Sequence, residues 1–181
     1  MASVEAKFPQ NPPLKTQRLV LGAQICLRIL TIVTTLAATW VVMTSRESAV
    51  IIGMTFEARY SYSPTIKFFA FANAIACVFS MLSLLFVFFF CRQGPNPANY
   101  YYLFLHDLFM MILVLAGCAA ATAEGYIGRY GNSHSGWTPI CDNFGKFCNK
   151  MMSSVILSYL SVFFLVMLII TSVNKSRLIQ V

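Results

Sequence analysis

One uncharged stretch of the chain decides the fold: residues 68–90 read FFAFANAIACVFSMLSLLFVFFF. An α-helix needs roughly 20 mostly apolar residues to cross the hydrocarbon core of a bilayer. This stretch has that length and contains no Asp, Glu, Lys or Arg. It therefore predicts a transmembrane helix.

Three further stretches have the same character. Residues 19–43 contain Arg28 as their only charged residue, and residues 151–173 contain no charged residue. Residues 100–123 contain the neighbours His106 and Asp107. The whole chain is 58% hydrophobic and only 10% charged, which is not the composition of a soluble domain. The sequence thus predicts an all-α membrane protein, a bundle of four transmembrane helices.

Two other readings of these stretches fit less well. A soluble protein would have to bury four helices that are apolar all round, and 181 residues are too few for that. A secretory signal peptide has a shorter hydrophobic region than residues 19–43, which also follow a polar stretch with three prolines. We expect the first span to be retained as a signal anchor.

The orientation in the membrane rests on the charges around the first span. Lys and Arg are equally numerous on the two sides of the bundle. Lys15 and Arg18 precede the first span and Arg46 follows it, and the first helix usually dominates topology. We therefore expect both termini in the cytosol, with Cys141 and Cys148 on the oxidising exoplasmic side.

This orientation divides the chain into tails, spans and loops. The short link between the second and third spans contains Gly94, Pro95 and Pro97 and requires these helices to be antiparallel neighbours. Ser63 and Pro64 are a plausible start for the second helix. The expected segments are a cytosolic N-terminal tail at 1–18, helices at 19–43, 68–90, 100–123 and 151–173, exoplasmic loops at 44–67 and 124–150, a cytosolic loop at 91–99 and a cytosolic C-terminal tail at 174–181.

Arg28 and Asp107 are the most informative single residues, because an ionised side chain in lipid is costly unless it is paired or hydrated. The first and third spans, which contain Arg28 and Asp107, are both expected to start from the cytosolic side. Counted from the start of each span, Arg28 is roughly 13 Å and Asp107 roughly 10 Å deep in the membrane. Matched depth predicts an intramembrane ion pair. Two alternatives remain: the Arg28 stem reaches back to the headgroups, or Asp107 is protonated and only hydrogen-bonded.

Polar and small residues recur along the spans at helical spacing. They form one stripe on each helix: Arg28, Thr31, Thr35 and Thr39; Asn73, Cys77 and Ser80; Gly117, Ala121 and Gly125; Ser154, Ser158 and Ser161. Such stripes let helices approach closely and hydrogen-bond. Packing within one chain is the favoured reading, ahead of association between chains.

The cysteines outside the apolar spans suggest two sites. Cys141 and Cys148 share one loop and are expected to form a disulfide. Zinc bound with His134 is the alternative, although the ligands would stop at three. Cys91, at the cytosolic end of the second span, is a possible palmitoylation site.

The sequence gives no support for catalysis, because it lacks a phosphate loop, a nucleophile elbow and a metalloprotease helix. We expect no catalytic residue, cofactor or metal. The net charge of +7 is scattered over short loops without an RNA-binding motif, so we expect membrane lipid and no nucleic acid as a partner.

Three features together resemble a known family. They are the Arg of the first span with the Asp of the third, the loop SGWTPICDNFGKFC at 135–148, and the run FFAFANAIA at 68–76. The chain resembles the plant Casparian strip membrane proteins from about residue 15 onward, most closely the CASP-like members of subgroup one. The first-loop signature of the family's namesakes is absent from residues 44–64, so a role at the Casparian strip itself does not carry over.

The resemblance implies a plasma-membrane protein related to the MARVEL tetraspan fold, with cytosolic termini. It also implies assembly into homodimers or higher homo-oligomers and into heteromers with other family members. It maps the family's Arg and Asp onto Arg28 and Asp107 and its paired loop cysteines onto Cys141 and Cys148. The implied function is a non-enzymatic scaffold that organises membrane domains and recruits cell-wall-modifying proteins. The alternative is a small transporter or channel subunit whose polar path contains Arg28, Asp107, His106 and Asn73.

Overall fold

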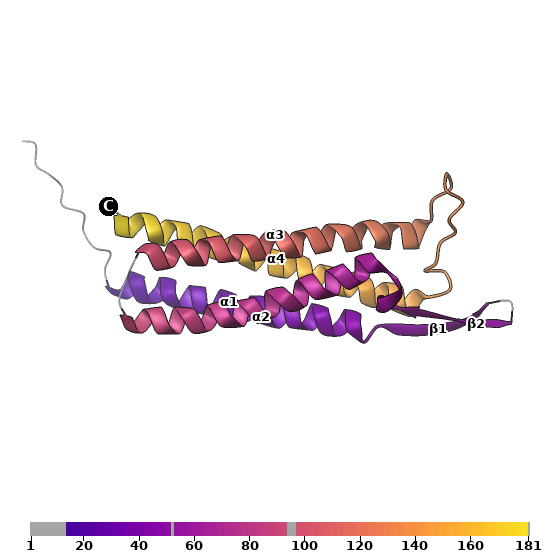
Figure 1. The fold of residues 1–181 in the computed structure, drawn as a ribbon, viewed down its shortest axis with the longest axis horizontal. Coiled ribbons are helices and arrows are strands. Elements are labelled where there is room, and N and C mark those ends of the chain that lie inside the picture. The colour runs from indigo at the N-terminus through magenta and orange to yellow at the C-terminus, as the bar shows by residue number, and fades with distance from the viewer. Residues whose placement is uncertain (1–13, 52, 94–96, 181) are drawn as a thin grey trace, which may run out of the picture.

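Four long helices run side by side in an elongated bundle (Figure 1). A computed structural model of the chain describes residues 14–51, 53–93 and 97–180. The helices are α1 Leu14–Met43, α2 Pro64–Gln93, α3 Pro97–Tyr130 and α4 Gly145–Gln180. Each contains an apolar stretch long enough to cross a membrane. The predicted four-helix fold is confirmed.

The helices are longer than the apolar spans read from the sequence. The span expected at 100–123, for example, lies within the 34 residues of α3. A helix does not have to stop where its apolar residues stop, because its backbone hydrogen bonds are satisfied internally in water as well as in lipid. At α2 the boundary follows the expected signal: Pro64 is the first helical residue, and the Ile66 N–H donates to Ser63 Oγ at 3.3 Å.

The helices form a four-cornered arrangement. The extensive contacts join α1 to α2 and α4, and α3 to α2 and α4. Helices α1 and α3 therefore lie diagonally opposite each other. The C-terminal end of α4 lies at one end of the bundle, and the loop after α3 lies at the other (Figure 1).

A β-hairpin follows α1 and projects beyond the helices (Figure 1). Its strands are β1 Arg46–Ile51 and β2 Met54–Arg59, paired antiparallel from Arg46↔Arg59 to Ile51↔Met54. The short helix η1 Tyr60–Tyr62 then leads into α2. A loop was predicted for residues 44–67, and the hairpin within it was not predicted. Its turn contains Gly53 with φ of 78°, a backbone conformation that glycine adopts easily.

The interior of the bundle is partly polar and its outer surface is apolar. Buried apolar residues such as Val42, Phe69 and Val114 form a core together with completely buried Thr31, Thr35 and Asn73. Outside, the side chains of Phe71, Phe86, Phe88 and Phe89 are more than half exposed. This distribution suits a helix bundle whose surroundings are lipid chains.

The small-residue stripe of α3 contributes to packing at only part of its length. A Cβ atom at Gly117 would lie 3.2 Å from Ala72 Cβ and 3.4 Å from Phe69 Cα, so the backbones of α2 and α3 approach closely there. Gly125 has no comparable neighbour within 4 Å. The stripe therefore packs against α2 within the chain at Gly117, whereas Gly125 is outside this contact.

We expect Gly117→Leu to destabilise the bundle by about 1 to 3 kcal/mol, because the new side chain would have to push α2 away from α3. Gly125→Leu is the matched control, since the space around it is open. Thermal unfolding of both variants in lipid nanodiscs measures the difference. Equal midpoints for the two variants would contradict the close approach at Gly117.

Candidate functional site

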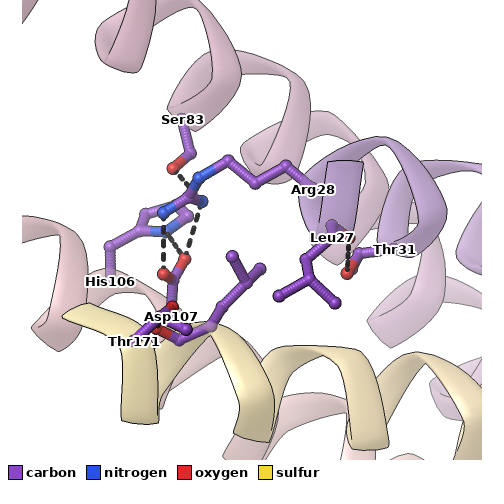
Figure 2. Close-up of polar contacts among 8 residues, drawn as sticks. Leu27, Arg28, Thr31, Ser83, His106, Asp107 and Thr171 are labelled. Atoms are coloured by element: carbon purple, nitrogen blue, oxygen red, sulfur yellow. Dashed lines mark hydrogen bonds and ion pairs between the residues drawn. The ribbon is translucent and has the colours of Figure 1, made fainter. Parts of the chain in front are cut away.

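Arg28 and Asp107 meet in the interior of the bundle as a bidentate ion pair (Figure 2). Arg28 Nη1 donates to Asp107 Oδ1 at 2.9 Å, and Nη2 donates to Oδ2 at 2.8 Å. Both side chains are 1% exposed. The guanidinium is thus turned into the bundle and away from the headgroups, and two parallel charge-assisted hydrogen bonds fix its plane against the carboxylate.

The pair connects α1 and α3, two helices that do not otherwise pack extensively against each other. Arg28 is on α1 and Asp107 is on α3, at opposite corners of the bundle. In the low dielectric of a membrane interior, each charge needs the other because an unpaired charge there is costly. The pair therefore acts as a central cross-link between diagonal helices.

Helix α2 also reaches this pair, because Arg28 Nη1 donates to Ser83 Oγ (Figure 2). His106, one quarter exposed, has its Nδ1 3.2 Å from Asp107 Oδ1 and donates to it when Nδ1 carries the proton. These contacts of the site come from α1, α2 and α3.

A second polar cluster joins three helices. Ser158 Oγ of α4 donates to Asn73 Oδ1 of α2 at 2.7 Å, and Cys118 of α3 donates to Ser158 at 3.1 Å. The Asn73 amide donates to Phe69 O of its own helix at 2.9 Å. The stripes of α2 and α4 thus meet as direct hydrogen bonds between helices.

The threonines of α1 behave differently. Thr31, Thr35 and Thr39 are buried, and each donates its hydroxyl to a carbonyl of α1 itself. Such back-bonding satisfies the hydroxyl without a partner on another helix. Helix α4 bonds to α1 through a serine instead: Ser154 Oγ donates to Ala38 O at 2.8 Å.

At the start of α4, a disulfide connects Cys141 of the preceding loop to Cys148, with Cα atoms 5.8 Å apart. Cys148 lies in the first turns of α4, so this bond ties the loop to the start of that helix. The loop also rests on the end of α3, because the N–H groups of Ile140 and Cys141 both donate to Gly128 O. With both sulfurs in this bond, neither is a thiolate that zinc could bind.

His134 does not join the two cysteines in a metal site. Its backbone N–H donates to Asn132 Oδ1 at 3.1 Å in an exposed turn. Among the described residues, no three His, Cys, Asp or Glu side chains lie close enough together to hold a metal ion. Cys91 lies in the last turn of α2, and its side chain is outside the part of the chain that the structure describes.

Glu47 adds a long-range contact at the same end. Its Oε2 accepts a hydrogen bond of 2.7 Å from the Phe147 N–H in the first turn of α4, which joins the β-hairpin to the segment that holds the disulfide. A carboxylate is favourable at a helix N-terminus, where free N–H groups and the helix dipole attract it.

Two of these residues, Ser83 and Glu47, were not predicted. Ser83 continues the α2 stripe three positions after Ser80, so extending that stripe by one step predicts it. Glu47 has no such signal, because its partner lies 100 positions away.

The geometry defines a class of protein: a four-span membrane bundle whose diagonal helices are joined by a buried Arg–Asp pair and whose last loop is closed by a disulfide. Comparison with known sequences agrees with this class. Residues 17–164 match the Casparian strip membrane protein domain. The chain belongs to the Casparian strip membrane protein family, in subgroup 1 of its CASP-like proteins.

The similarity to individual relatives extends over the full chain. It is 56% identical to "CASP-like protein 1F1" of Vitis vinifera, covering all of this chain and 88% of that protein. It is 55% identical to "CASP-like protein 1F1" of Ricinus communis over the full length of both. The protein of the same name from Populus trichocarpa is 54% identical over 98% of each chain. No solved structure matches the chain.

Proposed function

We propose that this protein is a non-enzymatic scaffold of the plasma membrane. It associates with copies of itself and with related chains, organises membrane domains and recruits cell-wall-modifying proteins. Both termini lie in the cytosol, and the hairpin and the disulfide loop lie outside the cell. The membership of the CASP-like group and the arrangement of polar groups in the bundle support this proposal.

The mutual pairing of the membrane-embedded charges is the observation that carries the proposal. A transport path needs charged or polar groups that a solute can reach, but Arg28 and Asp107 use both carboxylate oxygens and both terminal guanidinium nitrogens on each other. Asn73 and Ser158 are likewise bonded to each other. Such internal pairing favours a permanently packed bundle, as a structural component of the membrane requires.

Self-association can be measured on two differently tagged copies expressed together in plant plasma membrane. We expect the second tag to be recovered with the first after mild solubilisation, and recovery to be lost when the two copies are expressed separately and the membranes are mixed. Recovery of each tag alone from co-expressing cells would contradict the scaffold.

A transporter or channel subunit is the second candidate, and one observation favours it. Gln24 and Ser172 are buried, yet their side-chain polar atoms have no hydrogen-bond partner among the described residues. Purified protein in liposomes distinguishes the two candidates. The scaffold predicts that ion flux equals that of empty liposomes, whereas flux that disappears in Asp107→Asn would establish the channel.

A further inference from the structure

Four buried polar atoms of α1 and α4 lack a hydrogen-bond partner among the described residues. They are Nε2 and Oε1 of Gln24, Nε of Arg28 and Oγ of Ser172. Each of these three residues is at most 1% exposed. Leaving a buried donor or acceptor unpaired costs about 1 to 3 kcal/mol, so four such atoms together require an explanation.

These atoms belong to one region of the bundle. Gln24 is one helical turn before Arg28, on the same face of α1. The hydrogen bond from Ser154 to Ala38 O sets the antiparallel register of α4 against α1. Counting residues from that bond places Gln24 level with Leu168, and Ser172 about 6 Å further toward the end of the bundle that holds the start of α1.

The chemistry of the four atoms restricts what they can bind. Arg28 Nε and Gln24 Nε2 donate, Gln24 Oε1 accepts, and the Ser172 hydroxyl does both. The Arg28 charge is already balanced by Asp107, so the region has no net charge to hold an ion. A ligand must therefore be small, neutral and able both to donate and to accept hydrogen bonds.

We propose that Gln24, Arg28 and Ser172 form an internal hydration site that holds a small cluster of ordered water molecules on one side of the ion pair. Buried waters typically make about three hydrogen bonds to otherwise unpaired polar groups, and these residues offer a matching set. The waters connect Arg28 Nε to Gln24 and Ser172. The waters lie on the side of the ion pair toward the start of α1 and the end of α4, whereas Asn73 and Ser158, toward the hairpin, bond directly to each other.

The matched control for this proposal is the Asn73 side chain. It is also a buried amide, but its Nδ2 donates to Phe69 O and its Oδ1 accepts from Ser158. Solid-state NMR of the full chain in lipid bilayers measures how fast magnetisation passes from water to each amide, with Gln24→Leu assigning the Gln24 signal. We expect transfer to Gln24 to be several-fold faster than to Asn73. Equal, slow transfer to both amides would overturn the proposal.

A double-mutant cycle tests whether the same waters connect the residues. Gln24 and Ser172 have no direct hydrogen bond, so a dry interior predicts that the effects of Gln24→Leu and Ser172→Ala on unfolding add up. Shared waters predict a deviation from additivity. The control cycle combines Gln24→Leu with Ser161→Ala, because Ser161 donates only to Ser158 O of its own helix. Additive effects in both cycles would count against the shared cluster.

Discussion

Replacing either member of the ion pair with alanine should prevent normal folding. Arg28→Ala leaves a buried carboxylate, and Asp107→Ala leaves a buried guanidinium that Ser83 alone cannot neutralise. Removing one partner of a buried pair typically costs about 3 to 5 kcal/mol, which is a large share of the stability of a small domain. We expect both variants to be retained in the endoplasmic reticulum, as measured by the fraction that reaches the cell surface.

Two further variants make the ion-pair prediction specific. The double variant Arg28→Met with Asp107→Leu removes both charges and should recover surface expression, because a buried pair can often be replaced by apolar side chains without loss. The swap Arg28→Asp with Asp107→Arg should recover only part, since the exchanged side chains differ in length and the carboxylate that faces His106 Nδ1 is lost.

The exposed pair Arg59 and Glu57 is the control for a general effect of removing charge. Its side chains are 40% and 49% exposed, and exposed ion pairs contribute roughly 0 to 1 kcal/mol. Arg59→Ala should reach the surface like the parent. If Arg28→Ala and Asp107→Ala do the same, the pair has no structural role.

Removing the disulfide should have the second largest effect. The double variant Cys141→Ser with Cys148→Ser frees the loop in the unfolded chain, and closing so short a loop contributes about 2 to 3 kcal/mol. The loss should also loosen the first turn of α4, where Glu47 accepts from Phe147. We expect a lower unfolding midpoint in nanodiscs and faster proteolysis of the segment around Trp137.

The control for the disulfide is Cys26→Ser, because Cys26 is exposed and free. It should leave the unfolding midpoint unchanged. The intact protein should also be lighter than its reduced form by two hydrogens. Alkylation of both Cys141 and Cys148 in the native, unreduced protein would contradict the bond.

The sequence predicted the spans well because a membrane imposes a simple rule. A helix that crosses lipid must be apolar over a fixed length, and residues 68–90 satisfy this rule without reference to any other part of the chain. The closeness of Arg28 and Asp107 was predicted from their similar depth on the first and third spans, which run in the same direction. Depth is linear in residue number, so it can be counted before the packing is known.

The features that were not predicted have different causes. The hairpin at 46–59 gives a mixed signal: residues 54–59 alternate apolar and polar side chains, which is typical of a strand, but residues 46–51 do not alternate, and no Asn-Gly or Asp-Gly dipeptide marks the turn. Its Glu47 is positioned by a helix that begins nearly 100 residues later. The threonine stripe of α1 was found, but periodicity alone does not distinguish a hydroxyl that bonds to its own helix from one that bonds across helices.

The proposed role as a scaffold assembled in the plasma membrane is tested most directly by the mobility of the protein there. A fluorescent fusion at the C-terminus, expressed at native level in plant tissue, can be bleached in a small area and followed. We expect confinement to stable membrane regions and little recovery over minutes, with a single-span membrane protein recovering in the same cells. An even distribution with recovery as fast as that control would contradict the scaffold.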